Sequence, residues 1–125
     1  MKISEILGRP VRAFHGTNQK FDKFDLSKRA DPRGLFFTPH QTYAAKYGDT
    51  THAVDLHIQN PYEVSHDQRQ DNWQSVPPNH ILKRMGHDAI KVVRDPDADP
   101  NSMDSEERAN DVYLPFRNRQ IKIVR

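Results

Sequence analysis

The apolar segments of this 125-residue sequence are short, and glycine or proline interrupts the chain between many of them. The pattern predicts strands at 11–15, 34–38, 51–58, 62–64, 89–93, 112–116 and 121–124, and short helices at 41–47 and 79–85. Thr38 and Pro39 are typical of a helix N-cap and first helical position. Because strands and helices do not alternate regularly, the sequence favours an α+β fold over a doubly wound parallel sheet. Residues 1–10 are expected to form an N-terminal arm or a single helical turn.

The sequence contains no cysteine, which excludes disulfides, cysteine nucleophiles, zinc fingers and iron–sulfur centres. No apolar run approaches the roughly 18 residues of a membrane-spanning helix, so no membrane partner is expected. The N-terminal ten residues lack the apolar core of a signal peptide. Together these features predict a cytoplasmic protein.

Charge is unevenly distributed along the chain. Residues 94–111 contain seven acids and two bases, and the rest of the chain carries a net charge of +7. The basic remainder fits a polyanionic partner, such as a dinucleotide pyrophosphate or a nucleic acid. An ordinary solvated surface explains it equally well.

The acidic segment resembles a calcium-binding loop that begins at Asp95 and has Glu106 at its twelfth position. Pro100 occupies the sixth position, where such a loop needs a sharp turn and therefore glycine. The sequence thus favours a mobile acidic loop at 95–110 that folding does not require. No metal site is predicted, because the histidines show no ligand pairing at i and i+4 and are expected on the surface. They are His40, His52, His57, His66, His80 and His87.

Two segments carry candidate binding residues. His15 ends a predicted strand and is followed by Gly16, which would let a ligand approach the backbone. Aromatic residues lie on the 34–38 strand and on the helix after it, where they can enclose a flat ring or simply pack in the core. These aromatic residues are Phe36, Phe37, Tyr43 and Tyr47.

Four short motifs follow one another along the chain: Phe14-His15-Gly16-Thr17, Gly34-Leu35-Phe36-Phe37-Thr38, Ala44-Ala45-Lys46-Tyr47, and Asp111-Val112-Tyr113-Leu114-Pro115-Phe116 with Gln120-Ile121-Lys122. In this order they resemble the ADP-ribosyltransferase superfamily. The likeness is to its His–Tyr–Glu branch, which includes poly(ADP-ribose) polymerases and the short transferase domains of phage polyvalent proteins. It covers residues 11–125, which it marks as one ADP-ribosyltransferase-like domain.

The resemblance implies an α+β fold with split antiparallel β-sheets and short helices around a cleft for NAD, the co-substrate. It also assigns roles to individual residues. His15 would bond an NAD ribose hydroxyl, the Gly16 backbone would hold the nicotinamide carboxamide, and Thr17 would support the adenosine side. Phe36 and Tyr47 would flank the nicotinamide ring, with Tyr43 or Phe37 nearby or in the core.

The sequence departs from the family pattern at two positions. Ala44 stands where many relatives carry a serine that binds the nicotinamide amide. Val112 stands where the polymerases carry a catalytic glutamate, whose charge stabilises the cationic ribose that forms when nicotinamide leaves. Asp111 is one residue away, and it can reach the site only if it precedes the strand or lies on a bulge. Asp95, across the hairpin, is a second candidate.

These observations predict an NAD-dependent mono-ADP-ribosyltransferase of phage or prophage origin, with His15, Tyr47 and Asp111 as its catalytic residues. The expected acceptor is a host macromolecule, a protein rather than a nucleic acid. One alternative is a degenerate module that binds NAD or ADP-ribose without catalysis. Another is a small virion-associated or anti-defence protein that acts only by binding a protein partner.

Overall fold

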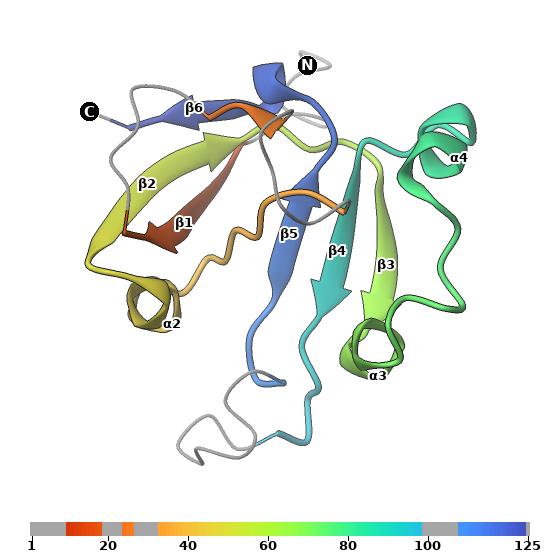
Figure 1. Cartoon of the computed structure of the whole chain (residues 1–125), viewed down its shortest axis with the longest axis horizontal. Coiled ribbons are helices and arrows are strands. Elements are labelled where there is room, and N and C mark those ends of the chain that lie inside the picture. Colours follow the sequence, from red (N-terminus) through yellow and green to blue (C-terminus); the bar gives the residue numbers. More distant parts are fainter. Residues whose placement is uncertain (1–9, 19–23, 27–32, 99–107, 125) are drawn as a thin grey trace, which may run out of the picture.

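Two three-stranded sheets make up the centre of the computed structural model, which describes residues 10–18, 24–26, 33–98 and 108–124 (Figure 1). One sheet has the order β1 (Val11–Thr17), β2 (Thr50–Leu56), β6 (Ile121–Ile123). The other has the order β3 (Pro61–Ser65), β4 (Ala89–Val93), β5 (Val112–Pro115). The helices are α2 (Gln41–Ala44), α3 (His66–Gln70) and α4 (Asn79–Arg84), with 3₁₀ turns at Ala45–Tyr47 and Asn118–Gln120. The predicted α+β class is confirmed.

The first sheet is antiparallel throughout, and β1 pairs with β2 from Val11 opposite Leu56 to Thr17 opposite Thr50. In the second sheet β4 and β5 are antiparallel, but β3 and β4 run parallel. The chain between β3 and β4 contains both α3 and α4, and parallel neighbours need such a crossover. The second sheet is therefore mixed, where the family resemblance implied an antiparallel one.

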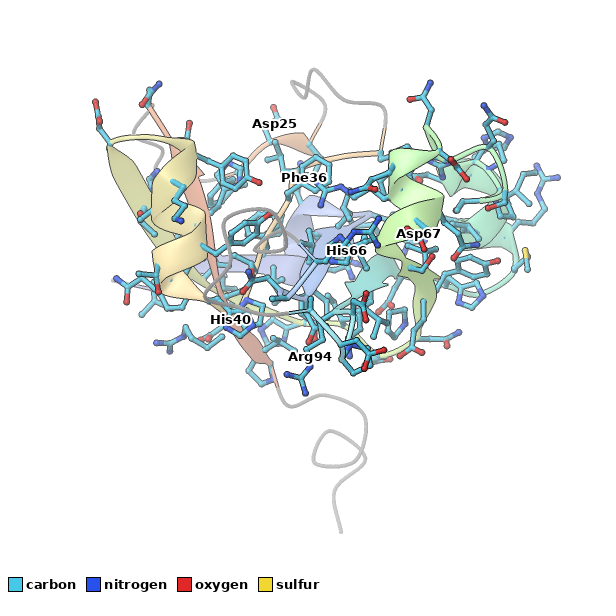
Figure 2. The ribbon with its side chains drawn as sticks, turned by 90° about the horizontal axis from the view of Figure 1, so that it is seen from below. Asp25, Phe36, His40, His66, Asp67 and Arg94 are labelled. Atoms are coloured by element: carbon cyan, nitrogen blue, oxygen red, sulfur yellow. The ribbon has the colours of Figure 1, made fainter. Side chains whose placement is uncertain are left out.

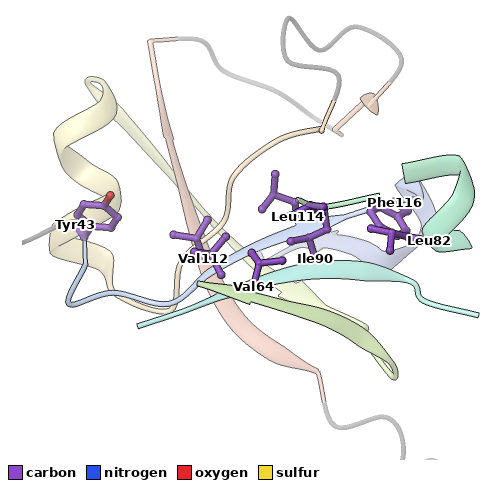
Figure 3. Packing of buried hydrophobic residues seen from close by; sticks show 9 residues of the cluster. Tyr43, Val64, Leu82, Ile90, Val112, Leu114 and Phe116 are labelled. Atoms are coloured by element: carbon purple, nitrogen blue, oxygen red, sulfur yellow. The ribbon is translucent and has the colours of Figure 1, made fainter. Parts of the chain in front are cut away.

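Each sheet has its own hydrophobic core. The core of the second sheet joins β3, β4 and β5 to α4 and to Tyr43 of α2 (Figure 3). It consists of Tyr43, Val64, Val76, Leu82, Ile90, Val92, Val112, Leu114 and Phe116. The core of the first sheet consists of Ala13, Phe24, Phe37, Val54, Leu56 and Tyr113. Phe37 and Tyr113 thus belong to the first core although neither lies on β1, β2 or β6.

Residues 34–38 join the two sheets. The sequence predicted a strand here, but Phe37 and Thr38 each form only an isolated bridge, the first to Tyr113 of β5 and the second to Phe14 of β1. Thr38 exchanges two backbone hydrogen bonds with Phe14, with N···O distances of 2.7 and 3.0 Å, and Phe37 exchanges two with Tyr113, at 2.9 and 2.6 Å. Successive backbone groups of an extended chain point in opposite directions, so neighbouring residues bond to different sheets. The strand prediction was wrong for that reason.

Helix α2 begins at Gln41, the first residue of the predicted helix, but its N-cap differs from the predicted one. His40 is its N-cap, and Thr38, predicted as the cap, instead accepts a hydrogen bond from the His40 backbone N–H through Oγ1, at 3.3 Å. The predicted helix at 41–47 is present as α2 followed by a 3₁₀ turn.

Helix α3 was not predicted. Ser65 Oγ accepts from Gln68 N at 3.1 Å, and Gln68 Oε1 accepts from Ser65 N at 2.9 Å. This reciprocal pair is a capping box, and the Ser-x-x-Gln spacing was the sequence signal for it.

Several predictions lie outside the described residues. They concern residues 1–9 of the arm and residues 99–107 of the acidic loop. Among the described helices none is both long and apolar enough to cross a membrane.

Candidate active site

A cavity of about 320 Å³ lies between the end of β1, residues 36–38, α2, α3 and the start of β5. Its volume is at the lower end of the range for small-molecule sites, about 300–1,000 Å³. The lining residues are Phe14, His15, Gly16, Phe36, Phe37, Thr38, Tyr43, Ala44, Tyr47, Arg69 and Val112. Seen from below, Phe36 lies between α2 and α3 (Figure 2). Six of the seven residues predicted to bind NAD therefore meet at one cavity, and the seventh, Thr17, does not line it.

His15 is held by its neighbours in one orientation. Its Nδ1 lies 2.7 Å from the carbonyl oxygen of Phe36, which can only accept, so Nδ1 carries the hydrogen in this bond. In the neutral ring Nε2 is then a hydrogen-bond acceptor. The ring also contacts Phe24 and Phe37, with centroids 5.3 and 5.2 Å away. Burial lowers the pKa of His15, against the opposing effect of the Phe36 bond and with a smaller contribution from His52.

The lowered pKa of His15 predicts a pH-dependent stability. The ordinary value is 6.5, so in the window just below it the unfolded chain binds more protons than the folded one. The free energy of unfolding should therefore fall as the pH drops from 7.5 to 5. Thermal melting at several pH values should show a smaller fall for His15→Ala. Equal slopes for wild type and variant would contradict the predicted pKa shift.

Gly16 allows the end of β1 to pack on α2. A Cβ built on Gly16 would lie 1.8 Å from the carbonyl oxygen of Ala44 and 3.2 Å from Cβ of Tyr47. Real Cβ atoms do not come this close to a carbonyl oxygen, so any side chain at this position requires the helix to move. The packing of β1 on α2 therefore requires glycine at this position, independently of any contact between the Gly16 backbone and a ligand.

The two tyrosines of the aromatic wall differ in exposure. Tyr43 and Tyr47 share a hydrogen bond between their hydroxyl groups at 2.8 Å, and their rings are nearly perpendicular. Tyr43 is 7% exposed and belongs to the core, whereas Tyr47 is 56% exposed. Phe37 is fully buried. Tyr47 is therefore the more exposed of the two tyrosines of the wall.

Sequence reasoning missed Arg69. This residue lies on α3 and lines the cavity, with its guanidinium carbon 4.6 Å from the centroid of the Phe36 ring. Because α3 was not predicted, nothing in the sequence placed Arg69 near the 34–38 segment. The capping box at Ser65 and Gln68 was the available signal for the helix, but not for the contact.

The candidate acids lie outside the cavity wall. Val112 lines the cavity, whereas the Asp111 carboxylate accepts a hydrogen bond from Arg94 N at 2.7 Å. The Asp95 carboxylate accepts from Asp97 N at 2.9 Å. Among the described residues that line the cavity none is acidic, and Arg69 carries a positive charge.

One histidine prediction was wrong. His66 was expected on the surface but is 2% exposed, because its ring lies under the end of the acidic segment and Nε2 donates to the carbonyl of Asn110 at 2.9 Å. Across the described ranges no three histidine, aspartate or glutamate side chains come together as a metal site would require.

The fold and the cavity together define a class of protein. A histidine–glycine pair at the end of one strand, an aromatic wall from the next segment and helix, and a mixed α+β framework are the arrangement that the resemblance to ADP-ribosyltransferases implied. The family model for ADP-ribosyltransferases in polyvalent proteins matches residues 6–125, so the chain belongs to that family. A search of curated proteins finds no match.

Proposed function

We propose that the protein is a mono-ADP-ribosyltransferase that uses NAD and modifies a host protein. The observation that carries this proposal is the meeting of His15, Gly16, Phe36 and Tyr47 at one cavity in a chain of this family. We also propose a cytoplasmic setting, with which a chain that lacks cysteine is compatible.

In the proposed reaction, Nε2 of His15 accepts a hydrogen bond from a ribose hydroxyl of NAD, because Nδ1 is committed to Phe36. The Gly16 backbone holds the carboxamide, and Phe36 and Tyr47 flank the nicotinamide ring. The bond between nicotinamide nitrogen and ribose carbon breaks, and its electron pair goes to the nitrogen, so that nicotinamide leaves neutral. The acceptor's nucleophile then bonds to the same ribose carbon, and its proton, where it has one, passes to solvent or a base.

The carboxylate of Asp111 is our proposal for the group that stabilises the ribose cation. Asp111 immediately precedes Val112, a residue of the cavity wall, and is the acid nearest to it along the chain. The absence of a carboxylate among the described lining residues favours a second candidate function, a module that binds NAD or ADP-ribose without transfer.

The transferase proposal is tested by incubating the protein with NAD labelled on its ADP-ribose part and with host lysate. Label on a protein that nuclease treatment leaves intact and protease treatment destroys supports the proposal. Label that is lost with nuclease shows a nucleic-acid acceptor. NAD binding without any label transfer favours the binding module.

His15→Ala should weaken NAD binding by about 1–3 kcal/mol, the usual effect of leaving a buried polar partner unpaired. Titration calorimetry of wild type and variant measures the difference. His80→Ala, which changes an exposed histidine on α4, is the matched control and should bind NAD like wild type. Equal NAD affinity for all three proteins would reject the proposed role of His15.

A further inference from the structure

Arg69 brings a positive charge to a cavity whose other described walls are uncharged or nearly so. The remaining lining residues are aromatic, aliphatic, glycine or threonine, apart from His15, whose lowered pKa favours the neutral ring. Charges interact more strongly in such low-dielectric surroundings than in water. The cavity therefore favours a ligand with a negative group near Arg69.

The contact with Phe36 orients the guanidinium. With its central carbon 4.6 Å from the ring centroid, the cation is held against the phenyl ring. A guanidinium carries five N–H donors in a fixed planar arrangement, and it can keep another contact while binding an oxyanion through two of them. This geometry suits a phosphate, which accepts paired hydrogen bonds from arginine.

We propose that Arg69 binds the pyrophosphate of NAD and of its product ADP-ribose. This inference rests on the proposed function of the cavity. A cavity of about 320 Å³ takes the nicotinamide ring and its ribose rather than a whole dinucleotide, so the phosphates lie at its boundary. Arg69 is half-buried, as expected for a residue at that boundary. The resemblance to known transferases assigned no residue to the phosphates.

The charge of Arg69 also discriminates between ligands. NAD carries a positively charged nicotinamide ring in addition to the pyrophosphate, and a nearby guanidinium repels that ring. ADP-ribose carries the pyrophosphate without this cation. Arg69 should therefore contribute more to the affinity for ADP-ribose than to the affinity for NAD.

The test is titration calorimetry of the full chain with ADP-ribose, NAD and nicotinamide riboside, which has the ring and ribose but no phosphate. Arg69→Met keeps an unbranched side chain and a favourable contact between sulfur and the Phe36 ring. It should bind ADP-ribose about tenfold or more weakly, the effect of losing a charge-assisted hydrogen bond. Arg69→Lys keeps the charge and should recover part of the affinity. Arg84→Met removes a charge from the exposed end of α4 and should leave all three affinities unchanged.

The affinity for nicotinamide riboside shows whether Arg69 contacts the phosphates or only shapes the cavity wall. Unchanged or tighter binding of this ligand to Arg69→Met, together with weaker ADP-ribose binding, supports a phosphate contact. An equal loss for both ligands would overturn the proposal, because Arg69 would then only shape the Phe36 wall. Unchanged ADP-ribose affinity with slower label transfer would also overturn it and would assign the arginine to the acceptor. A chain that binds ADP-ribose through Arg69 but transfers no label would keep this inference and reject the transferase.

Discussion

Asp111→Asn should lower the rate of ADP-ribosyl transfer by about 100-fold or more, the effect of losing one electrostatic stabiliser of the transition state. NAD affinity should change little, because the charge is needed chiefly when the ribose becomes cationic. The substitution is conservative for the fold, since an asparagine side-chain oxygen can still accept the hydrogen bond from Arg94 N that Asp111 accepts now. Initial rates with labelled NAD and the identified acceptor measure the effect.

Asp95→Asn is the matched control, because Asp95 lies at the other side of the same hairpin and also accepts a backbone hydrogen bond. It should transfer label at the wild-type rate. If the Asp95 variant were inactive and the Asp111 variant active, the catalytic acid would be Asp95, on the other side of the hairpin. Normal transfer by both would show that neither carboxylate is required.

Gly16→Ala should lower the melting temperature and abolish NAD binding. The added methyl group would lie 1.8 Å from the Ala44 carbonyl oxygen, and backbone cannot move aside as a flexible side chain can. Forcing an extra carbon into packed structure typically costs about 1–3 kcal/mol. The displaced element is α2, which carries Tyr43 and Ala44 of the cavity wall. Thermal melting and calorimetry on the same samples separate the two effects.

Gly86→Ala separates loss of stability from loss of the site. Gly86 has φ of +99°, so alanine there is strained, but the nearest atom to an added Cβ is 4.0 Å away. The position follows α4 and does not line the cavity. This variant should be destabilised and still bind NAD when folded. A Gly16→Ala protein that melts and binds like wild type would mean that β1 and α2 are not packed as described.

Elements with a clear apolar pattern could be predicted from the sequence. Residues 89–93 form β4 with the predicted bounds, because four of the five residues are aliphatic and such a run, largely buried, admits few alternatives. Helix α3 could not be found in this way, since its five residues are polar and carry no helical apolar period. The segment at 34–38 looks like a strand locally, and only its partners on two different sheets decide that it is not one.

The residues of the candidate site also fall into those that the sequence could predict and those that it could not. His15, Gly16 and the aromatic residues could be proposed together because ordered motifs mark them, and the structure places them at one cavity. Arg69 carries no motif, and its position depends on how α3 packs against Phe36. The sequence did not determine the direction of the Asp111 side chain either, because a shift of one residue along a strand turns a side chain to the opposite face of the sheet.

Phe37 and Thr38 belong at once to the wall of the cavity and to the junction between the sheets. A ligand in this cavity therefore touches parts of the chain whose folding depends on two separate hydrophobic cores. The binding free energy of the ligand adds to the stability of both cores together, because neither core can unfold without releasing the ligand. Occupancy would make the two halves of this small domain more cooperative in unfolding than they are in the empty protein.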